Sequence, residues 1–136
     1  MKKICFIGCV KLKTPEKNKV EELYCSPLFK LSLKYAKSKF DEVAVLSAKH
    51  GVLDLDVEIE PYEVTLNNMK ADEIKEWSKK VTDDIKNKYP PNEYEYYFIA
   101  GKKYHKYLDL DKNILFPLPI GKKMQKLKEE INNLAE

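Results

Sequence analysis

Residues 42–51 read EVAVLSAKHG, and this stretch decides how the rest of the chain is interpreted. Its first half, EVAVLS, is a short β-branched and apolar run that predicts a buried strand. The polar side chains of Ser47, Lys49 and His50 follow at once, and Gly51 then gives the backbone freedom to turn. An ordinary strand end gains nothing from a lysine beside a histidine, so we expect these side chains to serve a bound ligand.

Three further runs have the same character, namely KICFIGC (3–9), EYYFIA (95–100) and NILFPL (113–118). Helix-like segments separate the four runs: SPLFKLSLKYAKSKF (26–40), MKADEIKEWSKKVTDDIKNKY (69–89), GKKYHKYLD (101–109) and a closing segment over 121–136. In the first of them, Ser26 is a plausible N-cap and Pro27 occupies the first helical position. This alternation predicts an α/β fold, a three-layer αβα sandwich around a short, mainly parallel four-stranded sheet.

The two long predicted helices each carry an apolar stripe. The stripes are Leu28, Leu31, Tyr35 and Ala36 in the first and Ile74, Trp77, Val81 and Ile85 in the second. The stretch 53–69 is long for a connection and is expected to hold a small extra strand or a loop that folds over the sheet. With 136 residues, the simplest organisation is a single domain over 1–136.

Composition narrows the class of protein. The chain is 43% hydrophobic, yet no apolar run approaches the roughly 20 residues of a membrane-spanning helix, so no membrane partner is expected. The basic start MKKICFIG has too short an apolar stretch for a signal peptide, which predicts a cytoplasmic protein. Three cysteines do not suit a disulfide scaffold, and Cys5, inside a strand, is interpreted as core.

All 25 basic residues are lysines and the net charge is only +3. The overall charge therefore does not diagnose nucleic-acid binding, and the local placement of lysines has to carry that argument. Any phosphate bound here would be held by ammonium groups and backbone amides, without the bidentate contact of a guanidinium.

Ligands of open parallel sheets bind beyond the carboxyl ends of the strands. The residues that follow the first three predicted strands are Gly8, Cys9, Lys11 and Lys13; Ser47, Lys49, His50 and Gly51; and Gly101, Lys102, Lys103 and Tyr104. Acidic residues follow on the connection after the second strand: Asp54, Asp56, Glu58, Glu60 and Glu63. Ammonium groups on one side and a carboxylate on the other predict a site for a phosphate or a nucleotide.

Several other kinds of site are disfavoured. IAGKKYH (99–105) lacks the upstream glycine and the hydroxyl of a Walker loop, and no dinucleotide-binding glycine motif follows the first strand. Zinc spacing such as C-x-x-C is missing, so no metal and no cofactor are expected. A nucleophile formed by Cys9 and His50 stays open as an alternative. His105 is interpreted as a helix-surface or packing residue, and Trp77 as core.

Four ordered motifs carry a resemblance: GCVKLK (8–13), LYCSPLF (23–29), LSAKHGVLD (46–54) and IEPYEVTL (59–66). They resemble a family of small bacterial and phage domains of unassigned function. More distantly, the chain is similar to the uracil-DNA-glycosylase-like fold and to the module of archaeosine synthase that works on a deazaguanine base. The family often has tyrosine at the position of His50, which argues against His50 as an essential acid or base. It usually has aspartate at the position of Glu63, so the negative charge is kept there.

The resemblance implies an enzyme directed at a nucleobase or nucleoside, acting at an N-glycosidic bond or on a modified, deazaguanine-like base. Such chemistry needs a carboxylate that stabilises a cationic sugar or positions water, for which Asp54, Glu60 and Glu63 are candidates. It also needs a donor to the leaving base, for which Lys49 is the candidate, with His50 and Tyr62 behind it. A lysine amine that attacks to form a Schiff base remains an alternative.

The candidate catalytic residues are Cys9, Ser47, Lys49, His50 and Glu60. The candidate substrate-binding residues are Gly8, Lys13, Tyr24, Ser26, Gly51, Asp54, Tyr62, Gly101, Lys102 and Tyr104. The partner is expected to be a nucleobase, a nucleotide or nucleic acid. A module that binds nucleic acid without catalysis, through rim lysines and stacked tyrosines, is the second interpretation, and a structural domain with an exposed apolar patch is the third.

Overall fold

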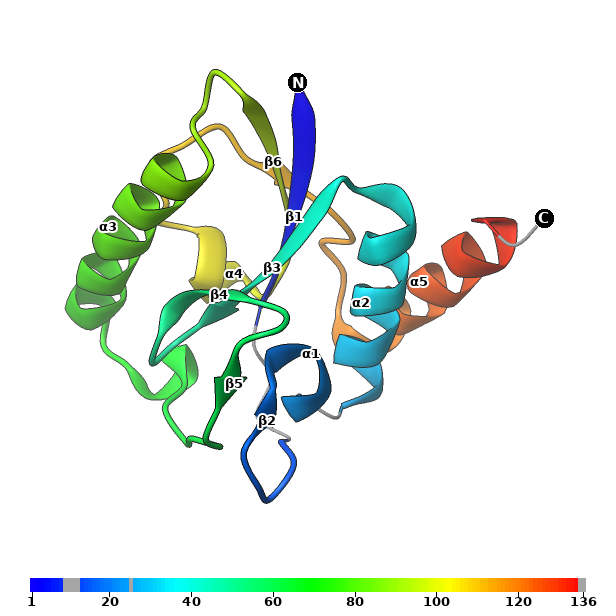
Figure 1. Cartoon of the computed structure of the whole chain (residues 1–136), viewed down its shortest axis with the longest axis horizontal. Helices are drawn as coiled ribbons and strands as arrows, with labels where there is room; N and C mark the ends of the chain where they lie inside the picture. The colour runs from blue at the N-terminus through cyan, green and yellow to red at the C-terminus, as the bar shows by residue number, and fades with distance from the viewer. Residues whose placement is uncertain (9–12, 25, 135–136) are drawn as a thin grey trace.

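A five-stranded sheet forms the centre of the molecule, in a computed structural model that describes residues 1–8, 13–24 and 26–134. Its strands, in spatial order, are β4 (Gly51–Asp54), β3 (Glu42–Ser47), β1 (Lys2–Gly8), β6 (Tyr94–Ile99) and β7 (Asn113–Ile114). The central strand β1 pairs in parallel with β3 and with β6, and β7 extends the parallel part beyond β6. Strand β4 runs antiparallel to β3 at the other edge (Figure 1).

The central strand is buried on both faces, which is why its sequence is a continuous apolar run. Ile4 and Phe6 pack into the core on one face of the sheet, whereas Cys5 and Ile7 pack into the core on the other. Successive side chains of a strand point to opposite faces, so one strand contributes to two cores. Burial raises the pKa of the Cys5 thiol to about 12, in keeping with its interpretation as a core residue.

Helices cover both faces of the sheet, as the three-layer prediction requires. Helices α3 (Ala71–Lys88) and α4 (Lys102–His105) pack on one face, and α2 (Pro27–Lys39) and α5 (Ile120–Leu134) pack side by side on the other (Figure 1). The α/β class and the four predicted helices are thereby confirmed. None of the helices in the described part of the chain combines the length and the apolar character that crossing a membrane requires.

The helices begin where the sequence predicts. The predicted stripe of α2 is right for Tyr35 and Ala36, whereas Leu28 and Leu31 are only partly buried. Ser26 is the N-cap of α2, where its Oγ accepts a hydrogen bond from the Phe29 amide at 3.1 Å, and Pro27 follows at the first position. In α3, Ile74, Val81 and Ile85 are buried on one stripe. Trp77 is only half-buried, because its indole lies at the edge of this core.

The sheet departs from the prediction in number and direction of strands, so the expected four-stranded, mainly parallel sheet is corrected to a mixed sheet of five. After β3 the chain does not cross over to a helix. It reverses through a turn over Ala48, Lys49 and His50 and returns as β4. Gly51 permits the reversal because it adopts a φ of 74°, a left-handed conformation that side chains with a Cβ disfavour.

Strand β7 is shorter than its predicted range of 113–118. Its ladder ends after the Leu115 amide donates to the Phe98 carbonyl. Phe116 then has a φ of 50°, and Pro117 has no amide hydrogen to donate, so the backbone leaves the sheet.

The long connection after β4 folds over the sheet and contains a small strand, as predicted for 53–69. Strand β5 (Glu58–Ile59) pairs antiparallel with β2 (Asn18–Lys19), which leads directly into α1 (Val20–Leu23). A short 3₁₀ turn, η1 (Leu66–Asn68), precedes α3. Further backbone hydrogen bonds join Val20 to Val57 and Glu21 to Leu55. These bonds hold two loops together that are far apart in the sequence.

Candidate functional site

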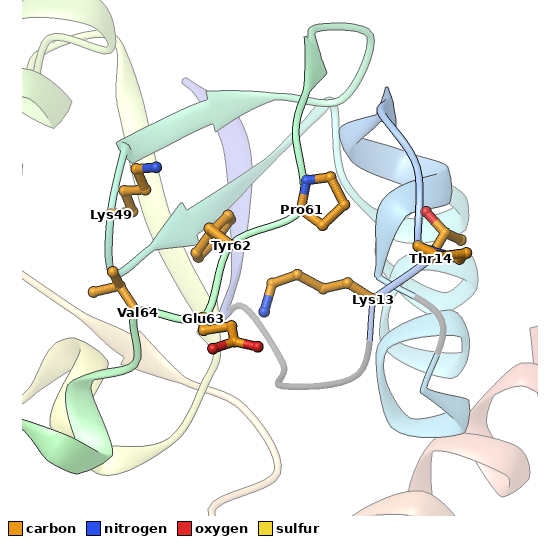
Figure 2. A pocket seen from close by; sticks show the side chains of 8 residues that line it. Lys13, Thr14, Lys49, Pro61, Tyr62, Glu63 and Val64 are labelled. Carbon is orange, nitrogen blue, oxygen red and sulfur yellow. The ribbon is translucent and has the colours of Figure 1, made fainter.

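An open hollow of about 1010 Å³ lies where these two loops meet the turn after β3 (Figure 2). It is lined by Lys13, Thr14, Pro15, Lys49, Pro61, Tyr62, Glu63 and Val64. The first three come from the loop after β1, Lys49 from the β3–β4 turn, and the rest from the segment after β5. The carboxyl ends of β1 and β3 are next to each other in the sheet, which is why their loops share one site.

Ser47 holds the turn on which Lys49 stands. Its side chain is fully buried, and its Oγ accepts hydrogen bonds from the amides of Lys49 at 3.2 Å and His50 at 3.0 Å. The carbonyl of Ser47 accepts a hydrogen bond from the Trp77 indole at 3.0 Å. Serine is suited to this position because a short hydroxyl side chain can satisfy the amides of a turn that starts at its own residue.

A chain of hydroxyl groups runs from this turn beneath the hollow. The Ser47 hydroxyl donates to the Tyr62 hydroxyl at 2.8 Å, and the Tyr62 and Tyr24 hydroxyls are hydrogen-bonded to each other. Either hydroxyl can donate in the bond between the two tyrosines, because the Tyr62 oxygen has a second lone pair besides the one that accepts from Ser47. Tyr24 is buried against Phe29 and Tyr62 is 7% exposed, so this chain fixes the wall of the hollow from inside.

Lys13 and Tyr62 form the centre of the hollow. The Lys13 ammonium lies 4.4 Å from the centroid of the Tyr62 ring and 5.6 Å from that of Tyr24, a cation–π arrangement. Figure 2 shows the Lys13 side chain extending across the hollow with its ammonium pointing toward Tyr62 and Glu63. Lys49 stands on the other side of the Tyr62 ring, so two ammonium groups and a carboxylate surround one aromatic ring.

His50 lies at the edge of this arrangement. Its ring packs edge-on against Tyr62 with 5.4 Å between centroids. Partial burial, followed by the charge of Lys49, lowers the pKa of the imidazole below its usual 6.5. A neutral imidazole can accept a proton, but it has no positive charge with which to attract an anion.

The structure brings together part of the predicted site. Lys13, Lys49 and Tyr62 line the hollow, and Ser47 and Tyr24 support it from beneath through the hydroxyl chain. Glu60 is exposed on the segment before Pro61 and is not among the lining residues. Of the three carboxylates proposed for the sugar, only Glu63 lines the hollow.

Asp54 does not belong to this site. Strand β4 runs antiparallel to β3, so Asp54 pairs with Ala44, three residues toward the amino end of β3 from Ser47. There its Oδ1 accepts from the Lys88 ammonium at 2.5 Å and from the Tyr89 hydroxyl at 3.4 Å. The prediction assumed that the chain leaves the sheet at Gly51. The hairpin instead carries Asp54 back toward the amino end of β3, away from the hollow.

Other predicted binding residues have structural roles away from the hollow. Ser26 caps α2, and Gly51 turns the hairpin. Gly8 allows close packing of β1, since a Cβ at this position would lie 2.9 Å from the Ala100 Cβ. Gly101, Lys102 and Tyr104 belong to the start of α4 on the other face of the sheet, where the Tyr104 ring packs edge-on against Trp77. Cys9, like Lys11, lies outside the described residues.

The sequence did not identify Thr14, Pro15, Pro61 and Val64 as lining residues, and it indicated Glu63 only as one of three possible carboxylates. The signal for most of them was present, since Pro61, Glu63 and Val64 flank Tyr62 within the motif IEPYEVTL. Among the described residues, no three His, Cys, Asp or Glu side chains are grouped as ligands for a metal ion. The hollow instead offers ammonium groups, which suit phosphate or carboxylate.

Comparison with other proteins finds one matching family and one similar curated protein. The DUF6884 family of unknown function matches residues 4–129. The uncharacterized protein YfjM of Bacillus subtilis (strain 168) is 32% identical over the whole of this chain and 97% of its own length. No solved structure matches the chain. The prediction of a small bacterial domain family of unassigned function is confirmed.

Proposed function

This chain belongs to the DUF6884 family of unknown function, and we propose that its hollow makes it an enzyme directed at a nucleobase or nucleoside. The observation that carries the proposal is that Lys13, Lys49 and Glu63 surround the Tyr62 ring in one hollow. The expected likeness to the uracil-DNA-glycosylase-like fold points the same way and remains a prediction.

Tyr62 and Lys13 provide the contacts for the base. The Lys13 ammonium lies over the Tyr62 ring, which is 7% exposed, so Lys13 covers the face that a base would need. A nucleobase that displaces the Lys13 stem would stack on the same face, and base–aromatic stacking is worth about 1–3 kcal/mol. The hydroxyl chain to Ser47 and Tyr24 holds the ring in place, so binding of a base costs little conformational entropy at Tyr62.

Glu63 and Lys49 provide the reactive groups. In cleavage of an N-glycosidic bond, the Glu63 carboxylate would stabilise the developing positive charge of the sugar or orient water toward it. The Lys49 ammonium, on the opposite side of Tyr62, would stabilise the negative charge left on the departing base. The base leaves with the bonding electron pair, and water supplies the hydroxyl to the sugar and a proton to the base.

The test has two steps, a screen for ligands that bind and an assay for turnover of those ligands. Nucleosides, deazapurines and short single-stranded DNA are screened for a rise in melting temperature, and reactions with the ligands that bind are analysed for released base. Glu63→Gln is expected to lower turnover by about a hundredfold or more with a small change in binding. Glu60→Gln is the matched control, because Glu60 is an exposed glutamate three residues away that does not line the hollow. Equal turnover in the two variants would refute the role of Glu63.

A non-catalytic module that binds nucleic acid is the second candidate, and the openness of the hollow favours it. Lys49, Glu63 and Val64 are all exposed, whereas electrostatic catalysis is strongest where water is excluded. Lys49→Ala separates the two candidates when compared with Lys13→Ala, because both lysines line the hollow. A module would lose similar affinity in both variants, whereas an enzyme would lose far more turnover than affinity in Lys49→Ala. No ligand-induced shift in melting temperature would count against both candidates.

A further inference from the structure

The Tyr62 ring, on which a base would stack, has three close neighbours inside the hollow and its wall. Tyr24 packs edge-on against it with 6.3 Å between the ring centroids, and His50 does so at 5.4 Å. The Lys13 ammonium lies over the ring, 4.4 Å from its centroid. Only 7% of Tyr62 is exposed as a result. A base can therefore reach the ring only after one of these neighbours has moved.

Lys13 is the neighbour whose side chain can move while the backbone stays in place. Its backbone forms an antiparallel bridge with Tyr24, and the next amide, that of Thr14, donates to the Leu23 carbonyl at 2.8 Å. The side chain is half-buried and has a long, flexible stem. Tyr24, in contrast, is buried and hydrogen-bonded to Tyr62. Rotation of the Lys13 side chain is thus the simplest way to uncover the ring.

The charges in the hollow indicate what would cause this rotation. Figure 2 shows the Lys13 ammonium pointing toward Tyr62 and Glu63, and a neutral base offers it no charge in exchange for these neighbours. A phosphate does, because hydrogen bonds between charged groups are roughly twice as strong as those between neutral ones. A phosphate bound to the ammonium in its present position would meet the like charge of Glu63. It would therefore draw Lys13 away from the ring.

We propose that the hollow takes a nucleotide, whose phosphate draws Lys13 off Tyr62 so that the base can stack. This inference rests on the proposed function and names its substrate class, a base that carries a sugar phosphate. The same movement takes the ammonium away from Glu63 and leaves the carboxylate facing the sugar. The phosphate belongs to a free mononucleotide or to a nucleic-acid strand, because both present the same charged oxygens.

Binding of matched pairs of compounds tests the substrate class. Adenosine, guanosine, cytidine and uridine are each compared by calorimetry with their own 5′-monophosphate, and a short single-stranded oligonucleotide of mixed sequence is the strand probe. The unchanged protein should bind at least one monophosphate about tenfold more tightly than its nucleoside. The probe that saturates at the lowest concentration identifies the source of the phosphate. Equal affinity within every pair that binds would overturn the inference.

Two variants separate the charge of Lys13 from its contact with the ring. Lys13→Met keeps a long side chain that packs well on an aromatic ring, but without the charge, so it should bind the monophosphate no better than the nucleoside. Lys13→Ala removes both features. It should bind the nucleoside about two- to fivefold more tightly than the unchanged protein does, the factor that corresponds to an exposed cation–π contact.

Lys17→Ala is the matched control, because Lys17 is an exposed lysine of the same loop that does not line the hollow. It should keep the full preference for the monophosphate. If both Lys13 variants also keep this preference, Lys13 is not the phosphate contact and the inference is wrong.

NMR follows the position of Lys13 directly in the unchanged protein. The ring current of Tyr62 should shift the Cε protons of Lys13 upfield, and the loss of this signal in Lys13→Ala identifies it. Saturation with the bound monophosphate should return the signal to the position of an exposed lysine. Inorganic phosphate alone should do the same at a higher concentration, because the base is not needed to move Lys13. A signal that stays upfield in the saturated complex would contradict the proposed movement.

These results also distinguish the inference from the proposed function. A preference for the monophosphate without release of base from any probe would support a nucleotide site and refute the reaction. Release of base with equal kcat/KM from a nucleoside and its monophosphate would support the reaction and refute the inference. If neither member of any pair binds, both are refuted.

Discussion

Ser47 shows how one buried side chain can position a site without touching its ligand. Its Oγ accepts from two turn amides and donates to Tyr62, so a single atom connects the turn that carries Lys49 to the wall of the hollow. The sequence indicated that Ser47 mattered, but it suggested a catalytic role. The structure gives it a positioning role, since it is fully buried beneath the ring.

Replacing Ser47 by alanine is expected to lower the free energy of unfolding by about 2 kcal/mol or more, because two amides and a tyrosine hydroxyl lose their partner inside the protein. Urea unfolding measures the change. The control is Ser38→Ala, which removes an exposed hydroxyl that donates to the Lys34 carbonyl and should change stability by less than about 0.5 kcal/mol. Similar losses in both variants would mean that the buried hydroxyl chain contributes little.

Tyr24 and Tyr62 are predicted to act as a pair. Tyr24→Phe and Tyr62→Phe should each destabilise the protein by about 1 kcal/mol. The double variant should lose less than the sum, because the hydrogen bond between the two hydroxyls is removed by either change. A double-mutant cycle from urea unfolding measures the coupling, and strictly additive losses would contradict it.

At the scale of elements, the β3–β4 hairpin decides which predicted residues meet. Gly51 has a φ of 74°, and a Cβ at this position would be in ordinary contact with Val81 at 3.6 Å and Asp84 at 3.7 Å. The cost of a side chain here therefore arises from the backbone conformation and not from a clash. Gly51→Ala should destabilise the protein by about 1–2 kcal/mol, measured by thermal or urea unfolding.

Two variants check this explanation. Gly51→Asn should recover part of the lost stability, because asparagine tolerates the left-handed region better than alanine. Gly121→Ala should be neutral or stabilising, since that glycine lies in the first turn of α5 with open space around it. If Gly121→Ala destabilises the protein as much as Gly51→Ala, the positive φ does not explain the effect.

Local patterns were sufficient for most elements of the fold. The apolar runs at 42–47 and 95–100 became β3 and β6 almost residue for residue, and the Ser26–Pro27 signal began α2 where predicted. The hairpin was not predicted because GVLD (51–54) is short and combines a glycine and an aspartate, which are typical of a loop. Strand β4 forms because β3, which ends three residues before it, offers a free edge for antiparallel pairing across a short turn.

At the scale of the whole molecule, the partial burial of His105, together with the positive charge near it, makes stability depend on pH. The pKa of His105 is lowered by burial and by Lys112, Lys123 and Lys102. The folded protein therefore binds fewer protons at this residue than the unfolded chain does, and stability should fall as the pH drops from 6.5 through the lower folded pKa. His50, with a lowered pKa, contributes in the same direction.

Urea unfolding at about pH 7.5 and about pH 5.5 measures this dependence. His105→Gln should make the protein less sensitive to acidification in this range, because the titrating group is removed while a polar side chain of similar length remains. His50→Gln is the comparison and should have the smaller effect, since His50 is exposed. An increase in stability on acidification would contradict the lowered pKa of both histidines.

The sequence by itself determined the α/β class, four of the sheet strands, the four helices and the membership in a family of small bacterial domains, because each rests on local periodicity or on ordered motifs. It also singled out Lys13, Lys49 and Tyr62. Only the tertiary structure decided that Asp54 leaves the site, that Glu63 stays in it, and that Ser47 and Tyr24 act from beneath Tyr62. These outcomes depend on the direction of β4, which pairs with β3 across a short turn, and on the pairing of β2 with β5. The second pairing joins residues about forty positions apart, and no local pattern specifies such a contact.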